Sequence, residues 1–253
     1  MRKSLRSGLN KTAKLLEKRA SLAQGKGWGS STIDSEVTAL WGFLETPPRI
    51  CIDIGGNVGN FTASLRLRNA DCLIHVFEPS RVNVETLKQR FSDDTKIYVV
   101  PFALSDFDGN SKLYFDNPGS PLASLTKRKL DHFAIDFNQV EEIKTVRFEN
   151  YWITELQRQT LDIVKLDIEG HELDALRGFG ECLKSVRVIQ FEFGGANIDS
   201  RTFFQDFFYF FEGNSFDLYR LGPLGPCLLD EYKESDEFFV TTNFIAVNRS
   251  KLY

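Results

Sequence analysis

Short apolar runs alternate with amphipathic stretches along most of the chain. Five of these runs predict buried β-strands, at residues 49–54, 73–77, 96–100, 162–166 and 186–191. Helix-like stretches follow most of them, at residues 58–67, 80–91, 172–178 and 202–211. Strands that alternate with helices form right-handed βαβ units. The pattern therefore predicts an α/β fold with a doubly wound, Rossmann-like and mostly parallel sheet.

Two segments depart from this alternation, and one helix-like stretch has two interpretations. Residues 216–221 and 238–248 read as strands joined by a Gly-Pro-rich loop, which predicts an antiparallel C-terminal hairpin at the sheet edge. Residues 107–150 form an insert, with one expected strand at 112–115 followed by a loop. The aromatic stretch 203–211 suits either a core helix or one wall of an acceptor pocket.

The N-terminal part has a different character. Residues 2–24 predict a helix, 25–31 a break, and 33–45 a second helix that ends before Pro47-Pro48. We therefore divide the chain into a basic helical extension, residues 1–46, and a main domain, residues 47–253.

Charge is distributed unevenly along the chain. Residues 1–26 carry eight Lys or Arg and one acid, Glu17, so they carry +7. The whole chain carries −4, which leaves −11 on the remainder. A basic arm on an acidic body suits peripheral contact with a membrane surface, a nucleic acid or an acidic partner, or simply a solvated helix. The acidic body argues against a nucleic-acid substrate.

Composition excludes several classes of protein. No apolar run reaches the roughly 20 residues that a membrane span needs, and the first residues lack the apolar core of a secretory signal. The four cysteines show no CxxC spacing, which argues against a zinc site and against a disulfide framework. These features predict a cytoplasmic protein. The sequence does not determine the oligomeric state.

The first chemical motif follows the first predicted strand. Asp53 is followed by a turn containing Gly55, Gly56, Asn57 and Gly59. Such a strand-to-helix turn lies where an open α/β sheet binds its ligand. Glycines allow close approach of the backbone, and N–H groups at a helix start suit a phosphate or carboxylate. Asp53 would repel a pyrophosphate but would accept hydrogen bonds from the ammonium group of a zwitterionic amino acid.

The second motif is Glu78, at the end of the second predicted strand and 22 positions after Gly56. An acid at this place typically binds the two hydroxyls of a ribose. The alternative is a surface acid before the next helix. Taken together, the two motifs predict a site for a nucleoside that carries an amino-acid or phosphate tail.

The third motif, residues 161–178, ends a buried strand with a group of polar residues. Asp167, Glu169, His171 and Glu172 follow the strand, and Lys165 inside it requires an acidic partner. The group suits removal of a proton from an acceptor hydroxyl, or a divalent cation held by hard oxygens. The structural alternatives are a helix-capping Glu172 and a hydrogen-bonded structural His171.

Two further segments belong to the same edge of the predicted sheet. Glu192 ends the fifth strand and is expected to face the same crevice. Ser105 and Asp106 follow the third strand, where the base of a bound nucleoside would lie. A plain turn is the alternative for these two residues.

These motifs together resemble the FkbM family of methyltransferases. The matching text is CIDIGGNVGNFT, VFEP, ALSD, DIVKLDIEGHELDALRG and IQFEF, within residues 49 to about 248. The most specific part of that text is KLDIEGHE followed by ALRG, in the fourth of these five blocks. Gly56 stands where the family often has Ala or Val. Residues 1–46 match no motif of the family.

The resemblance implies S-adenosylmethionine as the methyl donor and a sugar or natural-product hydroxyl as the acceptor. The glycine turn and Asp53 would hold the methionine part, and Glu78 the ribose. Residues 103–106 would flank the adenine, and Asp167 would lie near the sulfonium and the acceptor. The candidate general bases are His171 first, then Asp167 or Glu169.

Other functions also fit the same pattern. A nucleotide-dependent oxidoreductase on this fold would normally carry GxGxxG, which the chain lacks. A non-catalytic nucleoside-binding module would retain the fold without transferring a methyl group. Within the methyltransferases, nitrogen is the alternative to oxygen as the acceptor atom.

Overall fold

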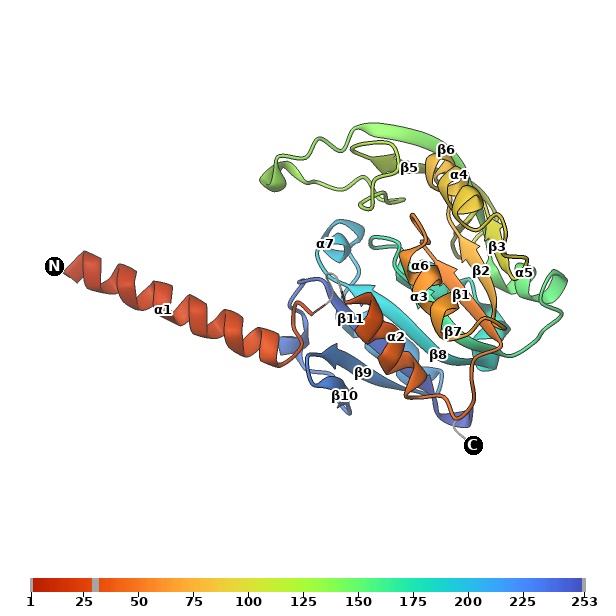
Figure 1. The fold of residues 1–253 in the computed structure, drawn as a ribbon. Helices are drawn as coiled ribbons and strands as arrows, with labels where there is room; N and C mark the ends of the chain where they lie inside the picture. Colours follow the sequence, from red (N-terminus) through yellow and green to blue (C-terminus); the bar gives the residue numbers. More distant parts are fainter. Residues whose placement is uncertain (1, 29–31, 252–253) are drawn as a thin grey trace.

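The computed structural model describes residues 2–28 and 32–251, with side chains from residue 10 onward. The main sheet has eight strands in the order β10-β9-β11-β8-β7-β1-β2-β3 (Figure 1). Its strands are β1 (Ile50–Ile54), β2 (Leu73–Phe77), β3 (Ile97–Val100), β7 (Leu161–Leu166), β8 (Val186–Phe193), β9 (Phe216–Gly222), β10 (Gly225–Leu229) and β11 (Thr242–Asn248). Neighbours from β3 to β8 are parallel, whereas β11 and β10 run antiparallel to theirs. The predicted fold class is confirmed.

Helices cover both faces of this sheet. They are α2 (Ile33–Trp41), α3 (Asn60–Arg68), α4 (Arg81–Arg90), α5 (Phe148–Thr154), α6 (Glu172–Arg177), α7 (Ala196–Ser200) and α8 (Phe204–Gly213). Side chains of α2, α3 and α4 pack into one apolar core, and those of α5, α6 and α8 into another. The result is a three-layer, doubly wound arrangement. Short 3-10 helices complete it at Asp131–Phe133, Gly180–Ser185, Glu234–Asp236 and Arg249–Lys251.

The aromatic stretch forms the core helix α8. Phe204, Phe207, Phe208 and Phe211 are buried, at the spacing of one helical face. Phe207 and Phe211 both stack on Phe191 of β8. The helix therefore fills the core beneath the sheet, as the first of the two interpretations predicted.

The central strands are predictable because they are buried on both faces. Every residue of β1 and β7 is buried, which is why their sequences are almost continuously apolar. The polar exceptions have partners inside the protein. Asp162 of β7 accepts hydrogen bonds from the backbone N–H groups of Arg49 (2.7 Å) and Ile50 (3.1 Å).

The C-terminal strands differ in detail from the prediction. The hairpin at the sheet edge joins β9 to β10, which occupies a segment expected to be loop. β10 contains Pro226. The sheet tolerates this proline because β10 is an edge strand, which leaves one side of its backbone unpaired. β11 begins at Thr242, later than expected, and lies between β8 and β9 rather than at the edge.

The insert contributes two strands to a second sheet, where the sequence predicted one, and β4 just before the insert completes the order β4-β6-β5. The strands of this second sheet are β4 (Ala103–Leu104), β5 (Gly109–Phe115) and β6 (Gln139–Val146). β6 escaped prediction because it is largely polar and exposed, with Ile143 and Thr145 as its buried side chains. Figure 1 shows this sheet arching over the end of the molecule that carries β3.

The two N-terminal helices behave differently. α1 (Arg2–Ala23) projects away from the body (Figure 1). α2 lies on the sheet, with Val37 and Leu40 in the core and Glu36 accepting a hydrogen bond from Gln190 of β8. It ends at Trp41, four residues earlier than expected. Residues 29–31 of the expected break lie outside the described residues. Among the described helices, none combines the length and apolarity that a bilayer crossing requires.

Candidate active site

The glycine turn between β1 and α3 is shaped by close packing. Gly55 has a φ of +80°, and a Cβ there would lie 1.9 Å from the carbonyl oxygen of Asp167. Gly59 has a φ of +83°, and a Cβ would lie 2.6 Å from the ring of Phe91. Both positions favour glycine because of their left-handed backbone, and at Gly55 a side chain would also meet backbone atoms that cannot yield.

The N–H groups of this turn are engaged within the protein. Those of Gly55 and Gly56 donate to the carbonyl of Phe77 (2.9 and 3.1 Å), and that of Asn57 donates to Glu78 Oε2 (2.8 Å). These three N–H groups are therefore already paired in this structure and are not available to an anion. What the turn offers instead is a close approach of the backbone to the end of the sheet.

Glu78 follows β2 and is held rigidly. Its Oε1 accepts a hydrogen bond from the N–H of Ser80 (3.0 Å), and its Oε2 accepts the one from Asn57. Burial raises the pKa of this carboxyl, although the hydrogen bonds oppose that shift. Each oxygen retains a further lone pair, so the carboxylate can still accept a hydrogen bond from a ligand.

Asp53 occupies a different place from the one predicted. Its side chain is fully buried, and its Oδ2 accepts a hydrogen bond from Thr62 Oγ1 of α3 (2.6 Å). Because side chains alternate along a strand, Asp53 faces the α3 layer, whereas Ile52 and Ile54 face the opposite core. The predicted convergence of Asp53 with Glu78 and Asp167 around one ligand is therefore incomplete: Asp53 acts through a neighbour.

That neighbour is Lys165 of β7, whose predicted acidic partners are present. Its Nζ lies 3.2 Å from Asp167 Oδ2 and 3.7 Å from Asp53 Oδ1. Burial would lower the pKa of the ammonium group, but the two carboxylates outweigh burial and raise it. Lys165 therefore stays charged and links the buried Asp53 to Asp167 at the strand end.

A cavity, here called the strand-end cavity, lies where β1, β2 and β7 end. Glu78 and Asp167 both line it, together with Gly55 and Asn57 of the glycine turn. Its apolar wall contains Phe77, Phe102, Ala103, Leu104, Leu113 and Leu125. The insert closes it from the other side with Ser120, Pro121, Ala123 and Ser124. A cavity lined by both acidic and apolar groups suits a polar ligand with a flat apolar part.

His171 lines the cavity but has partners on both ring nitrogens. Nε2 lies 3.0 Å from Ser105 Oγ, and Nδ1 lies 3.3 Å from Asp174 Oδ2. Burial lowers the pKa of the imidazole, and Asp174 and Asp106 oppose that shift. This geometry matches the alternative of a hydrogen-bonded structural histidine, because neither ring nitrogen is left to accept a proton from a substrate. Ser105 and Asp106 belong to this network, whereas the preceding Ala103 and Leu104 line the cavity.

Three carboxylates meet beside the cavity. Asp167, Glu169 and Glu192, here called the carboxylate cluster, have oxygens that all lie within 4.8 Å of one another. Burial raises the pKa of Glu169 to about 8 and raises that of Glu192 well above its usual value, and Asp167 adds to both shifts. In the part of the chain that the structure describes, the Glu192 carboxylate has no hydrogen-bond or ion-pair partner. Hard oxygens of this kind suit a divalent cation, but no second feature of the described residues points to one.

Glu172 fixes the turn that carries Asp167 and Glu169 of the carboxylate cluster. Its carboxylate accepts hydrogen bonds from the N–H groups of Ile168 (2.9 Å) and Gly170 (3.1 Å). Burial raises its pKa to about 7, although the hydrogen bonds oppose that shift. The side chain thus has the structural role of fixing the backbone between β7 and α6.

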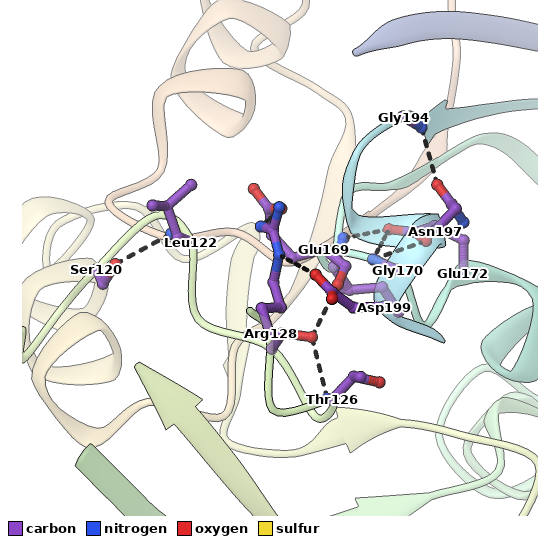
Figure 2. A network of polar contacts seen from close by, with 12 residues as sticks. Ser120, Leu122, Thr126, Arg128, Glu169, Gly170, Glu172, Gly194, Asn197 and Asp199 are labelled. Carbon is purple, nitrogen blue, oxygen red and sulfur yellow. Dashed lines mark hydrogen bonds and ion pairs between the residues drawn. The ribbon is translucent and has the colours of Figure 1, made fainter. Parts of the chain in front are cut away.

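Arg128 of the insert fastens the insert to the site, a contact that the sequence did not predict. Figure 2 shows its guanidinium between Glu169 and Asp199, with which it forms ion pairs. Ser124 of the same segment donates a hydrogen bond to the carbonyl of Glu169 (2.8 Å). Because the partners lie 41 and 71 positions apart in the sequence, no local pattern reveals the contact.

The raised pKa of Glu169 predicts a pH dependence of stability. Since the native state binds this proton more tightly than the unfolded chain, its stabilising effect is present below about pH 4.5 and is lost as the pH rises through about 8. We expect the Tm of Glu169→Gln to depend less on pH than that of the wild type. As the pH rises through that window, the free energy of unfolding of the variant should increase relative to that of the wild type by on the order of 2 kcal/mol. Thermal denaturation at a series of pH values measures this.

The exposed Glu85 on α4 offers the matched control. Glu85→Gln should follow the wild-type curve throughout. If Glu169→Gln also follows the wild-type curve, the native pKa of Glu169 is not raised.

The cavity at the carboxyl ends of the parallel strands, with an acid after the second strand, lies where doubly wound α/β proteins bind their ligands. A model of the methyltransferase FkbM domain matches residues 53–218, more than half of the chain. The protein belongs to the FkbM methyltransferase family. This membership favours the methyltransferase hypothesis over the oxidoreductase one.

Two known proteins illustrate the relationship. The 2-O-methyltransferase NoeI of Sinorhizobium fredii is 22% identical over 190 residues, which are 71% of this chain and 76% of NoeI. The crystal structure of methyltransferase FkbM from Methylobacillus flagellatus shares the fold, with a TM-score of 0.51 at 15% identity over 81% of this chain. The match covers 45% of that solved chain, so this protein corresponds to less than half of it.

Proposed function

We propose that the protein transfers a methyl group from S-adenosylmethionine to a hydroxyl oxygen of a saccharide or natural-product acceptor. The observation that carries the proposal is that Glu78 and Asp167, from separate strand ends, line one cavity with the glycine turn. The motifs of the FkbM family fall on these residues. The name of the relative NoeI, a 2-O-methyltransferase, supports oxygen as the acceptor atom.

The residues around the cavity suit the polar and apolar parts of the donor. Glu78 would accept hydrogen bonds from the ribose hydroxyls, and Ala103 and Leu104 would contact the adenine, beside Ser105 and Asp106. Gly55, Gly56, Asn57 and Gly59 would let the methionine part approach the backbone. Asp167, held by Lys165 and through it by Asp53, would face the positive groups of the donor. When bound, the donor supplies a methyl group already activated on a cationic sulfur.

Because the donor is activated, the protein must mainly align the acceptor and accept its proton. A neutral hydroxyl is a weak nucleophile and needs a base within hydrogen-bond reach. Two members of the carboxylate cluster, Asp167 and Glu169, line the cavity, and Glu192 has an oxygen within 4.8 Å of theirs. Among the members of the cluster, Glu192 is the strongest candidate, because Glu169 is bound to Arg128 and Asp167 to Lys165.

We expect Glu192→Gln to lower turnover by about 100-fold, the usual contribution of a general base, and to leave the Kd for S-adenosylmethionine within about twofold. His171→Ala should also preserve donor binding, and it should lower turnover less, since its ring nitrogens already have partners. Steady-state kinetics and calorimetry measure the two quantities separately. A greater loss of turnover in His171→Ala than in Glu192→Gln would instead identify His171 as the general base.

The proposed function itself is tested with S-adenosylmethionine labelled on its methyl group. The full chain is incubated with a panel of saccharides, their amino-sugar analogues and small phenols, and label transfer is measured. The proposal predicts transfer to a hydroxyl in a saccharide or phenol. Transfer to the amino sugars alone would make nitrogen the acceptor, and donor binding without transfer to any acceptor would favour a non-catalytic binding module.

A further inference from the structure

The helix α1 has charged side chains that the proposed function does not use. Its side chains from residue 10 to residue 20 are all exposed. They include Lys11, Lys14, Lys18 and Arg19, with Glu17 as the one acid. The sequence of the helix adds Arg2, Lys3 and Arg6. α1 therefore carries a strong positive charge, in contrast to the acidic remainder of the chain.

Three of the basic side chains lie on one side of the helix. Lys11, Lys14 and Lys18 follow the i, i+3, i+7 spacing of a single face, and Ala13, Leu16 and Ala20 follow the same spacing on the opposite face. The apolar face is narrow and built mainly of alanine. Such a helix adsorbs to a surface chiefly through its charge, with shallow burial of its apolar side.

The base of α1 is anchored to the body. Gly25, with a φ of +84°, ends the helix, and the N–H of Lys26 donates to the carbonyl of Ser21 (2.9 Å) in a Schellman-type cap. Arg220 of β9 donates to the carbonyl of Gln24 (2.8 Å), and Gly27 donates to Thr242 Oγ1 (2.8 Å). These contacts fix the direction in which α1 leaves the domain.

That base lies at the same edge of the sheet as the candidate active site. Trp28, just after the helix, accepts a hydrogen bond from the N–H of Asn243 (3.3 Å). Asn243 pairs across the sheet with Glu192 of the carboxylate cluster. A surface that binds α1 therefore comes to lie beside the edge that carries the strand-end cavity.

We propose that α1 docks the protein on an anionic membrane surface. Charge complementarity favours a membrane as the partner of α1. Anionic lipid attracts each basic side chain of the helix, whereas a second copy of α1 would repel it. Each Lys or Arg near an anionic leaflet strengthens binding by about fivefold. The attraction is screened by salt beyond roughly 10 Å. The proposal is independent of the methyl-transfer chemistry.

Vesicle co-sedimentation of the full chain tests the proposal, with vesicles of phosphatidylcholine alone or of equal parts phosphatidylcholine and phosphatidylserine. We expect binding to the mixed vesicles only, and weaker binding at high salt. The variant K11Q/K14Q/K18Q/R19Q should bind at least tenfold more weakly. Glutamine keeps a high helix propensity, and circular dichroism together with S-adenosylmethionine binding verifies that the body is intact.

The control variant K88Q/K112Q/K144Q/K251Q removes the same charge from exposed positions on the body, and it should bind vesicles within about twofold of the wild type. Equal loss in the two variants, or equal binding to neutral vesicles, would overturn the proposal. It would also be overturned if α1 failed to bind lipid but bound duplex RNA, or if the wild type formed dimers that the α1 variant does not form.

Discussion

Replacing Gly55 by alanine is expected to weaken donor binding and to destabilise the fold. The added Cβ would lie 1.9 Å from the carbonyl oxygen of Asp167, which belongs to backbone that cannot move without separating β1 from β7. The left-handed φ of +80° adds strain for any residue with a side chain. We expect the free energy of unfolding to fall by roughly 3 kcal/mol. The affinity for S-adenosylmethionine should fall at least tenfold.

Chemical denaturation and calorimetry measure these two effects. Gly213→Ala is the matched control, because Gly213 ends α8 and a Cβ there meets no atom within 4 Å. That control should bind the donor as the wild type does and lose no stability. Wild-type affinity in Gly55→Ala would show that the glycine turn does not shape the donor site.

Replacing Glu78 by glutamine is the second change with a large expected effect. The substitution keeps the size of the side chain but replaces one acceptor oxygen by a donor group. It would lose the charge that binds the ribose hydroxyls and would face the N–H of either Asn57 or Ser80 with a second donor. Hydrogen bonds to a charged group contribute about 1.5–3 kcal/mol. We therefore expect the Kd for S-adenosylmethionine to rise roughly 10- to 100-fold.

Two measurements make this result specific. Glu85→Gln, on the exposed side of α4, should leave the Kd unchanged. Donor analogues that lack the ribose hydroxyls should bind wild type and Glu78→Gln with similar affinity, since the lost interaction is absent from both complexes. If the analogue distinguishes the two proteins as strongly as the natural donor does, Glu78 does not bind the ribose.

The parallel core was predictable because its physical requirements are local. β1, β2, β7 and β8 are buried, and their apolar runs between glycines and acids are visible in the sequence. The same topology brings the carboxyl ends of these strands together. The shared location of Glu78 and Asp167 at one cavity therefore followed from sequence alone, as did an acidic partner for Lys165.

The remaining features depend on contacts between distant segments. Asp53 follows the strand pattern, yet the face on which its side chain lies depends on Thr62 and Lys165. Arg128 reaches Glu169 from an insert whose strands are mostly polar and exposed. The partners of His171 likewise come from Ser105, 66 positions away, and from the next helix. Apart from the i, i+3 spacing of His171 and Asp174, no periodicity or spacing encodes such pairings.

The central claim is that the strand-end cavity binds an adenosyl amino acid. Calorimetric titration of the full chain with S-adenosylmethionine, and in parallel with NAD, tests it most directly. We predict saturable binding of S-adenosylmethionine with one site per chain, competition by S-adenosylhomocysteine, and no heat of binding with NAD. Binding of NAD alone, or of neither compound, would contradict the account.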